Sequence, residues 1–386
     1  MQLSPDQKYA LDVLLSWYRQ KDKKSYITLG GYAGTGKTTL ISILRQQLHK
    51  KNNKLKVAFV SYTGKGARVL EGKISHSKSK YKQDYIGTIH SLFYSPIIDP
   101  ETEEIIGWEG KDTIDIDLII VDEASMVNQR IWQDMLSYSI PVLAVGDHGQ
   151  LPPIEGEFNL MQQPDIKLEQ IHRQAAGDPI IHVSQIARQT GQIPVGVFGN
   201  GVRKINRYDP DIYNELEDIL QGYNSNTLIL CGYNFTRIKL NQQIRQNKGI
   251  ETEIPVIGDR VICLRNNHKK QIFNGMLGTI NSISPETKDY YAKIEFDDGH
   301  FFQGIILAQQ FNSKMVYNFS SKRKETLEAD LFDYGYALTV HKAQGSEAKK
   351  VVLFEERFKQ MTDEMWKKWL YTAVTRAQEE LIIIGA

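Results

Sequence analysis

Short apolar runs rich in β-branched residues recur along the chain, and between them apolar residues recur every three or four positions. Runs of this length are typical of parallel strands that are buried on both faces. The intervening stretches, for example 38–48 and 130–136, have the spacing of amphipathic helices. Because strands and helices alternate, the sequence predicts an α/β fold. The predicted strands are 26–29, 57–61, 118–121, 142–145, 228–231, 351–354 and 381–384.

Two segments interrupt this alternation. Between 258 and 330, apolar and polar residues alternate around Asn-Gly and Asp-Gly pairs, as in antiparallel strands joined by tight turns. We expect this segment to form a small antiparallel barrel. Between 92 and 106, two apolar arms flank a polar run of turn formers. We expect a hairpin here, inserted between a helix and the next strand.

Length and composition describe an ordinary folded protein. At about 150 residues per domain, 386 residues leave room for two or three domains. Apolar residues make up 41% and charged residues 24%, which argues against a disordered, collagen-like or coiled-coil chain.

The cysteines and the apolar runs indicate a cellular compartment. Cys231 and Cys263 are too few for a disulfide framework and lack metal-site spacing, so buried free thiols in a reducing compartment are expected. No apolar run reaches the roughly 18 residues of a membrane span, and charges occupy the first residues, where a signal peptide is apolar. The expectation is a cytoplasmic protein, in a bacterial or phage-infected cell, that does not bind a membrane.

One segment has the pattern of a phosphate-binding loop. Gly31-Tyr-Ala-Gly-Thr-Gly-Lys-Thr38 matches GxxxxGK[ST], follows a predicted strand and opens a predicted helix at Thr38. Its glycines let backbone N–H groups turn toward phosphate oxygens, and the helix N-terminus adds its positive dipole end. Lys37 is expected to reach the β- and γ-phosphates, and the Thr38 hydroxyl to ligate Mg²⁺. The alternative is a glycine-rich structural turn.

Two carboxylates follow the apolar run 118–121 directly. They stand at the carboxyl end of a predicted strand, where α/β sheets bind ligands. Asp122 is suited to the Mg²⁺ shell, and Glu123 to activating the attacking water. Helix capping is the alternative for this pair alone. Together with the phosphate-binding loop, the pair predicts an ATPase.

Further segments resemble motifs of the superfamily 1 helicases, in particular of the Dda and RecD-like branch. The matching segments are LSPDQKYAL with Gln7 (Q motif), VLAVGDHGQLPP with Gln150 (motif III), LEQIHRQ with Arg173 (motif IV), ALTVHKAQGSE at 337–347 (motif V) and YTAVTR with Arg376 (motif VI).

The resemblance implies a role for each matching residue at the nucleotide. Gln7 would read the adenine edge, and Gln150 would link the γ-phosphate to the bound strand. Arg173 and Arg376 would reach the γ-phosphate from the second RecA-like domain, so hydrolysis would depend on closure of two domains. For each arginine alone, a surface salt bridge is the alternative. The residues expected to contact the nucleotide are Gln7, Gly31, Ala33, Gly34, Thr35, Gly36, Lys37, Thr38, Thr39, Gly345 and Glu347.

The distribution of charge, together with the motifs, predicts that one side of the first domain binds a nucleic-acid strand. Residues 45–82 hold eleven basic residues against one acidic, whereas 99–123 hold ten acidic against one basic, so the net charge of +1 conceals a polarised first domain. Lysine and hydroxyl groups that contact phosphates fix position without reading sequence. About half of these lysines are expected to lie on a solvent-exposed face without contacting phosphates.

The resemblance also indicates which residues contact DNA. The segments 61–67 and 87–91 resemble motifs Ia and Ib, and the hairpin resembles a pin that splits the duplex. Phe93, Tyr94 or Trp108 would stack on a terminal base, with packing inside the hairpin core as the alternative. The expected DNA contacts are Thr63, Lys65, Thr88, His90, Phe93, Thr339, His341 and Lys342.

The resemblance, together with the α/β pattern, thus implies two RecA-like P-loop NTPase domains with a pin at about 91–112 and an SH3-like 2B insert. The expected boundaries are 1–158 for domain 1A, 159–257 and 331–386 for the two parts of domain 2A, and 258–330 for the insert.

The resemblance implies a monomeric ATP- and Mg²⁺-dependent DNA helicase that moves 5′ to 3′ on single-stranded DNA and opens a duplex fork. Candidate protein partners are single-strand-binding, replication or recombination proteins. The alternative is an ATPase, stimulated by single-stranded DNA, that displaces bound protein without processive unwinding. A binding module with an inactive phosphate loop is a third reading, but no residue of the nucleotide site is missing.

Overall fold

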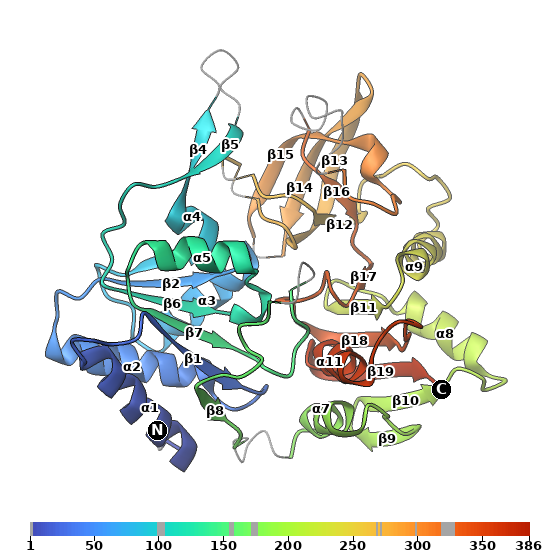
Figure 1. The fold of residues 1–386 in the computed structure, drawn as a ribbon. Helices are drawn as coiled ribbons and strands as arrows, with labels where there is room; N and C mark the ends of the chain where they lie inside the picture. Colours follow the sequence, from blue (N-terminus) through green and yellow to red (C-terminus); the bar gives the residue numbers. More distant parts are fainter. Residues whose placement is uncertain are drawn as a thin grey trace. The chain divides into compact units, whose positions relative to one another are not determined.

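The computed structural model describes residues 3–98, 105–153, 158–170, 177–267, 269–270, 272–297, 299–317 and 329–386. The chain divides into two compact units, Met1–Ile181 and His182–Ala386. Each unit contains a six-stranded sheet covered by helices (Figure 1), so the predicted α/β class is confirmed.

The sheet of the first unit has the order β3-β2-β6-β7-β1-β8, and every neighbouring pair in it is parallel. Parallel neighbours require crossovers, which the helices supply. The elements are α1 (Pro5–Arg19), β1 (Tyr26–Gly31), α2 (Lys37–Lys51), β2 (Val57–Ser61), α3 (Gly64–His76), β3 (Tyr85–Thr88), α4 (Ile89–Phe93), β4 (Tyr94–Ile98), β5 (Ile105–Gly110), β6 (Leu118–Asp122), η1 (Ala124–Met126), α5 (Gln129–Ser137), β7 (Val142–Gly146) and β8 (Ile166–Leu168).

The core of this unit lies on both faces of the sheet. In β6, Leu118 and Ile120 belong to the cluster that includes residues of α1 and α2, whereas Ile119 and Val121 belong to the cluster that includes residues of α5. Successive side chains of a strand point to opposite faces, so a strand covered on both sides becomes a continuous apolar run. In Figure 1, α5 and α1 with α2 lie on opposite faces of this sheet.

The sheet of the second unit has the order β17-β11-β18-β19-β10-β9, with only the β9–β10 pair antiparallel. Its elements are α7 (Pro179–Thr190, which crosses the boundary between the units), β9 (Gly196–Gly199), β10 (Val202–Asn206), α8 (Ile212–Gln221), β11 (Thr227–Cys231), α9 (Asn234–Asn247), β17 (Ala337–Thr339), β18 (Ala348–Phe354), α11 (Asp363–Val374) and β19 (Ala377–Gly385).

A five-stranded antiparallel sheet is inserted between α9 and β17, with the order β15-β14-β13-β12-β16. A bridge from Ile306 to Asp330 brings its two edges together, and an apolar cluster fills its interior. The last strand ends at Tyr334, four residues beyond the predicted end of the segment. Its elements are β12 (Arg260–Cys263), β13 (Leu277–Glu286), β14 (Asp289–Phe296), β15 (Phe301–Ile306), η2 (Ala308–Gln310) and β16 (Phe332–Tyr334).

The seven predicted strands all form strands of the two six-stranded sheets. The predicted hairpin is present as the antiparallel pair β4–β5, but its first arm begins at Tyr94 rather than Leu92. Leu92 and Phe93 belong to α4 because Thr88 caps a short helix there with a reciprocal side-chain bond to Ser91. Among the described residues, no helix combines the length and the apolar character needed to cross a membrane.

Candidate nucleotide and nucleic-acid site

The phosphate-binding loop joins β1 to α2 in the first unit. Gly34 and Gly36 have φ of 79° and 77°, a left-handed conformation that strains other residues. The Thr35 hydroxyl donates to the Tyr32 carbonyl at 2.8 Å, which tightens the turn. Alternation of left- and right-handed backbone is what forms a concave anion-binding nest. Ala33, Thr38 and Thr39 lie on the same loop and on the first turn of α2.

The Lys37 ammonium lies inside this loop. It donates to the carbonyls of Gly31 and Tyr32 at 2.6 and 3.0 Å. Burial raises the pKa of Asp122, and the Lys37 ammonium opposes that rise. Lys37 and Asp122 are 85 positions apart in the sequence, but in the fold they are close enough for their charges to interact.

The two carboxylates at the end of β6 differ in backbone conformation, because Asp122 is the last residue of the strand and Glu123 follows it. The Glu123 N–H donates to an Asp122 carboxylate oxygen at 3.0 Å, and Glu123 has φ of 55°. A left-handed conformation costs a non-glycine residue about 1–2 kcal/mol, and strain of this kind collects at functional sites. Helix capping does not explain Glu123, because its side chain makes no capping bond to η1.

The loop after β7 contacts the phosphate-binding loop. β7 is the neighbour of β1, with Gly146 in register with Gly30. The His148 and Tyr32 rings lie with centroids 4.1 Å apart, and burial lowers the pKa of His148. Gln150 is 6% exposed, and its Oε1 has no hydrogen-bond partner within the described residues. Neither Tyr32 nor His148 is predicted from the sequence as a site residue, because only the strand pairing brings them together.

Gln7 also reaches the phosphate-binding loop. Its side-chain amide donates to the Thr35 carbonyl at 2.9 Å, and its side-chain oxygen accepts the Ser4 N–H at 3.1 Å. The neighbouring Asp6 carboxylate accepts the backbone N–H groups of Glu169 and Gln170, just after β8. The first turn of α1 therefore joins the phosphate-binding loop to the segment that follows β8. Contact of Gln7 with adenine stays a prediction.

The segments resembling motifs Ia and Ib follow neighbouring strands of the same sheet. Ser61 at the end of β2 is in register with Asp122 of β6 on one side and Thr88 of β3 on the other. Thr63 and Thr88 both cap the helices that follow, and their side chains accept the backbone N–H groups of Gly66 and Ser91. Thr63 and Thr88, which are predicted to contact the DNA strand, therefore lie at the same carboxyl edge of the sheet as the nucleotide site.

The remaining predicted contacts in this region differ in burial. Lys65 is half-buried on the first turn of α3. His90 lies on α4 beside the Tyr94 ring, and burial lowers its pKa.

The prediction that Phe93 contacts DNA is not supported by its position. Phe93 is 1% exposed and packs in the core beneath the hairpin, with its ring 5.2 Å from that of Tyr138. The core-packing alternative therefore holds for Phe93, because a ring buried by its own unit presents no face to a base. The Trp108 side chain lies outside what the structure describes.

The base of the hairpin is tied to α5. The Tyr94 hydroxyl donates to the Asp134 carboxylate at 2.5 Å, and the Tyr138 hydroxyl donates to the Lys111 carbonyl at 2.7 Å. The Lys111 ammonium in turn donates to the Ser91 carbonyl at 2.8 Å. These bonds connect the hairpin to the helix that follows Asp122 and Glu123.

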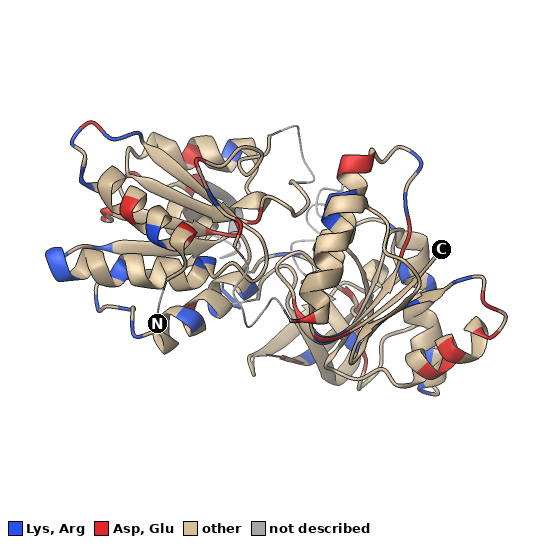
Figure 2. Ribbon diagram, turned by 90° about the horizontal axis from the view of Figure 1, so that it is seen from below, with Lys and Arg blue, Asp and Glu red and all other residues tan. Residues whose placement is uncertain are grey.

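Fewer basic side chains of the segment 45–82 are available to bind a partner than its composition indicates. Arg45 is fully buried in an ion pair with Asp84 at 2.8 Å, so it does not belong to a binding surface. Lys56 pairs with Asp115, and Lys80 with Glu71. Figure 2 shows basic and acidic residues distributed over each unit.

In the second unit, the segments resembling motifs V and VI meet. Arg376 follows α11 and is 3% exposed, and its guanidinium donates to the carbonyls of Thr372 and Ser346 at 3.0 and 3.2 Å. Gly345, with φ of 73°, and Glu347 flank Ser346. Thr339 ends β17, and His341 and Lys342 follow it. Arg173 lies outside the described residues.

Oxygen donors suitable for Mg²⁺ are present in the first unit. The Thr38 hydroxyl and the Asp122 carboxylate are oxygen ligands of the kind Mg²⁺ prefers. Within the described ranges, no group of three His, Cys, Asp or Glu side chains could hold a metal ion. This donor set fits an ion that takes its remaining ligands from water and substrate phosphates.

Comparison with known protein families assigns the chain. The model of the AAA domain family matches residues 2–201, which is more than half of the chain. The chain belongs to the AAA domain family. A model of the UvrD-like helicase C-terminal domain matches residues 334–384 of this AAA family member.

Two of the similar proteins are DNA helicases by name. The ATP-dependent RecD2 DNA helicase of Deinococcus radiodurans is 28% identical over an alignment that covers 93% of this chain and 47% of that protein. The ATP-dependent DNA helicase dda of Enterobacteria phage T4 is 27% identical, over 68% of this chain and 61% of that protein. This AAA family member thus spans about half the length of RecD2. These relatives bear out the resemblance to superfamily 1 helicases of the Dda and RecD-like branch.

Solved structures resemble the fold over nearly the whole chain. The structure of a Bacteroides Pif1 bound to single-stranded DNA has a TM-score of 0.57 and 19% identity, covering 99% of this chain and 92% of that one. The Pif1 helicase of Candida albicans has a TM-score of 0.51 and 17% identity. At these identities, the likeness concerns the fold alone.

Proposed function

We propose that this protein is an ATP-dependent DNA helicase that moves 5′ to 3′ along single-stranded DNA and separates duplex strands. The observation that carries the proposal is the register of Ser61 with both Asp122 and Thr88, which brings nucleotide and strand-binding residues to one sheet edge. Hydrolysis at such an edge can change the contacts of the bound strand. The names of the relatives RecD2 and dda support the same activity.

In this proposal, the first unit binds and activates the nucleotide. The phosphate-binding loop and Lys37 hold the β- and γ-phosphates. Thr38 and Asp122 hold Mg²⁺, which neutralises phosphate charge when bound. Glu123 orients the attacking water. Gln150 links the γ-phosphate to the bound DNA strand by donating its side-chain amide N–H to a phosphate oxygen, and its buried Oε1, unpartnered among the described residues, is left to accept from water.

Two arginines complete the nucleotide site. Arg173 and Arg376 stabilise the charge that develops on the transferred phosphoryl group. The present partners of Arg376 are two main-chain carbonyls and the Thr375 hydroxyl, none of which carries a full charge, so a phosphate competes well for its guanidinium.

The strand-binding part comprises hydroxyl and cationic groups of both units. Thr63, Lys65, Thr88 and His90 contact the strand from the first unit, and Thr339, His341 and Lys342 from the second. Such contacts to phosphates do not depend on sequence. The hairpin β4–β5 acts as the separating pin, and the antiparallel sheet corresponds to an SH3-like 2B insert. The protein works as a monomer, on DNA and at forks, with replication or recombination proteins as candidate partners.

Unwinding of matched tailed duplexes tests this function. We expect Mg-ATP to drive separation of a duplex with a 5′ tail and not of one with a 3′ tail. Preference for the 3′ tail would overturn the direction of movement. ATP turnover stimulated by single-stranded DNA, without strand separation on either substrate, would favour the alternative of an ATPase that displaces bound protein.

A further inference from the structure

Helix α9 buries a polar stripe along one face. Arg237, Asn241 and Arg245 are four residues apart, so they lie on the same side of the helix, and they are 2%, 0% and 2% exposed. Buried polar side chains are costly unless they are hydrogen-bonded. The stripe therefore requires partners, and the antiparallel sheet with its connections to the parallel sheet supplies them.

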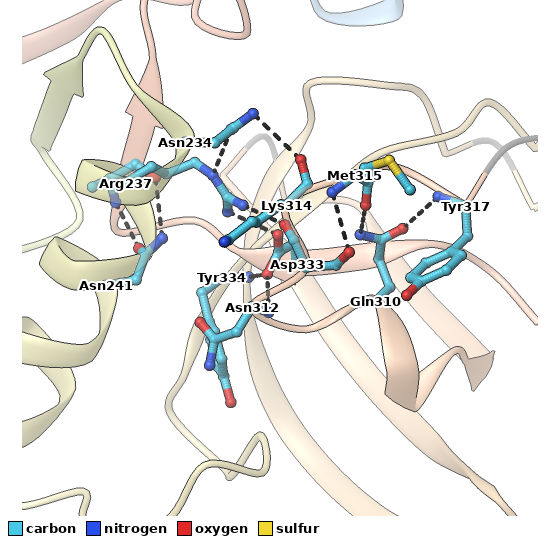
Figure 3. Close-up of polar contacts among 12 residues, drawn as sticks. Asn234, Arg237, Asn241, Gln310, Asn312, Lys314, Met315, Tyr317, Asp333 and Tyr334 are labelled. Atoms are coloured by element: carbon cyan, nitrogen blue, oxygen red, sulfur yellow. Dashed lines mark hydrogen bonds and ion pairs between the residues drawn. The ribbon is translucent and has the colours of Figure 1, made fainter.

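The first residue of the stripe, Arg237, uses all three nitrogens of its guanidinium (Figure 3). Nη1 donates to Asp333 Oδ2 at 2.8 Å, Nη2 to the Ser313 carbonyl at 2.7 Å, and Nε to Asn234 Oδ1 at 3.2 Å. Asp333 belongs to β16 of the antiparallel sheet, and Ser313 to the loop after η2. One side chain of α9 thus holds two separate segments of the insert.

The last residue of the stripe, Arg245, holds the same chain at a second point. Its guanidinium pairs with Asp259 Oδ1 at 2.9 Å, and the same oxygen accepts the Tyr336 hydroxyl at 2.8 Å. Asp333 and Tyr336 both precede β17 in the sequence. The chain that runs from β16 to β17 is therefore attached to α9 through the two outer residues of the stripe.

The middle residue, Asn241, bonds directly to β17. Its Oδ1 accepts the Ala337 N–H at 2.8 Å, and its amide donates to the Ala337 carbonyl at 3.3 Å. Ala337 is fully buried, so its main-chain groups need partners within the protein. One amide side chain supplies both partners, and it pairs with β17 as a neighbouring strand would.

The place of β17 in the sheet explains why such a partner is needed. The strand is three residues long and stands at the end of the strand order, next to β11. On the β11 side, the Val340 N–H donates to the Cys231 carbonyl at 3.1 Å. Alternate residues of a strand direct their N–H and C=O groups to opposite sides, so Ala337 faces away from β11. An edge strand presents such groups unpaired, and here Asn241 takes them.

The strand leads directly to the predicted DNA contacts. Thr339 is the last residue of β17, two positions after Ala337, and Lys342 follows three positions later. The Ala343 N–H donates to the Thr339 carbonyl at 3.1 Å, so the chain turns as it leaves the strand. Because β17 is so short, the two bonds to Asn241 are a large share of the main-chain bonds that fix its position.

We propose that Asn241 is a positioning residue for strand binding, which fixes β17 through both main-chain groups of Ala337 and so places the Thr339 hydroxyl against a phosphate of the bound strand. This inference rests on the proposed DNA-binding function. It assigns a role to a residue outside every segment that resembles a helicase motif. The ion pairs of Arg237 and Arg245 hold the incoming chain against the same helix.

Equilibrium binding of the full chain to an oligothymidylate, without ATP and at constant ionic strength, tests the inference. Asn241→Leu keeps the branched shape of the side chain and removes both hydrogen-bonding groups. We expect its dissociation constant to rise about three- to tenfold, which is the size of the loss of one phosphate contact. Gln242→Leu removes an amide from the exposed side of the same helix and should leave the affinity unchanged.

A double-mutant cycle separates positioning from a merely structural role. Thr339→Val removes the hydroxyl that Asn241 is inferred to place, with little change of shape. If Asn241 acts through Thr339, the double variant should bind within about twofold of the weaker single variant. Additive losses would overturn the inference, because Asn241 would then act independently of Thr339. Unchanged affinity in either single variant would overturn it as well.

Hydrogen exchange of the free protein locates the effect of the substitution. In Asn241→Leu, we expect faster exchange of the amides in the segment 337–343 and unchanged exchange in β18 and β19. Faster exchange throughout the second sheet would show a general loss of stability and would contradict a positioning role. If Asn241→Leu does not fold, Asn241→Ser takes its place in the cycle. A water molecule can then bridge to Ala337, so the expected loss of affinity is smaller, about two- to threefold.

These measurements do not depend on strand separation. If the cycle shows that Asn241 acts through Thr339 but no tailed duplex is unwound, the proposed helicase function fails and the inference stands. If duplexes are unwound but the losses in the cycle are additive, the function stands and the inference fails.

Discussion

Gln7 donates its side-chain amide to the main-chain carbonyl of Thr35 at 2.9 Å, so the first helix is bonded directly to the phosphate-binding loop. Gln7 is 1% exposed, and its side-chain oxygen is used by the Ser4 N–H. A glutamine in this position can therefore act on the nucleotide through the loop that holds it. This action differs from direct contact with adenine and has its own consequences.

Replacement of Gln7 by leucine should weaken ATP binding by about three- to tenfold, because one buried hydrogen bond contributes about 0.5–1.5 kcal/mol. Affinity for single-stranded DNA without nucleotide should change little. The measurement is the dissociation constant for ATP, with Lys8→Ala on the exposed side of the same helix as the control. Unchanged affinity for ATP would show that the bond to Thr35 does not support the loop.

Replacement of Lys37 by alanine should reduce ATP turnover at least about hundredfold, because the cation that faces the phosphates is lost. Binding of single-stranded DNA should be largely retained, since Lys37 lies in the phosphate-binding loop. Lys50→Ala, at the exposed end of the same helix, is the matched control. Turnover that survives Lys37→Ala would refute the assignment of the loop.

Replacement of Tyr94 by phenylalanine should reduce strand separation more than ATPase activity stimulated by single-stranded DNA. The reason is that the hydroxyl fixes the base of the hairpin to Asp134 on α5, while the nucleotide site is left intact. Both activities are measured on the same preparation, and Tyr9→Phe on the exposed face of α1 is the control. Equal losses of both activities would count against a separate role for the hairpin.

Replacement of Phe93 by alanine should lower the free energy of unfolding by about 3–5 kcal/mol, as for other large aromatic side chains removed from a core. Denaturant unfolding measures this loss, and Phe235→Ala, at a 69% exposed ring, is the control. A variant as stable as the unsubstituted protein, but defective in strand separation, would restore Phe93 as a fork contact.

The two cysteines should be unreactive in the folded protein. Burial raises the pKa of Cys263 to about 12 and raises that of Cys231 as well, so both thiols stay protonated at neutral pH. The reactive species is the thiolate, and each side chain is also inaccessible. Labelling with a thiol reagent between about pH 7 and 9 should be slow and should become fast in urea. Rapid labelling of the native chain would contradict the burial.

Some parts of the site could be predicted from sequence because they depend on adjacent residues. The loop from Gly31 to Thr38 carries its own turn glycines, its cation and the start of its helix. Asp122 and Glu123 follow an apolar run whose residues pack on both sides of a sheet. Neither feature required a distant partner to be recognised.

Other parts could not be predicted because they depend on contacts between distant segments. Arg45 counts toward a basic patch in the sequence, but in the structure it is buried in the core, where it pairs with Asp84, 39 positions away. Phe93 looks like an exposed aromatic beside a hairpin, but Tyr138 and the neighbouring core cover it. The spacing of Arg237, Asn241 and Arg245 is visible in the sequence, yet four-residue spacing of polar residues is also typical of a solvated helix face.

The sequence by itself determined the α/β class, the positions of the buried strands and the phosphate-binding loop, because local patterns of burial and backbone conformation specify these features. The tertiary structure decided which charges are free and which are paired, what Gln7 contacts, and how α9 holds the chain that leads to Lys342. These depend on strand order and on side chains brought together across the fold, and the cost of burying a charge without a partner selects among them.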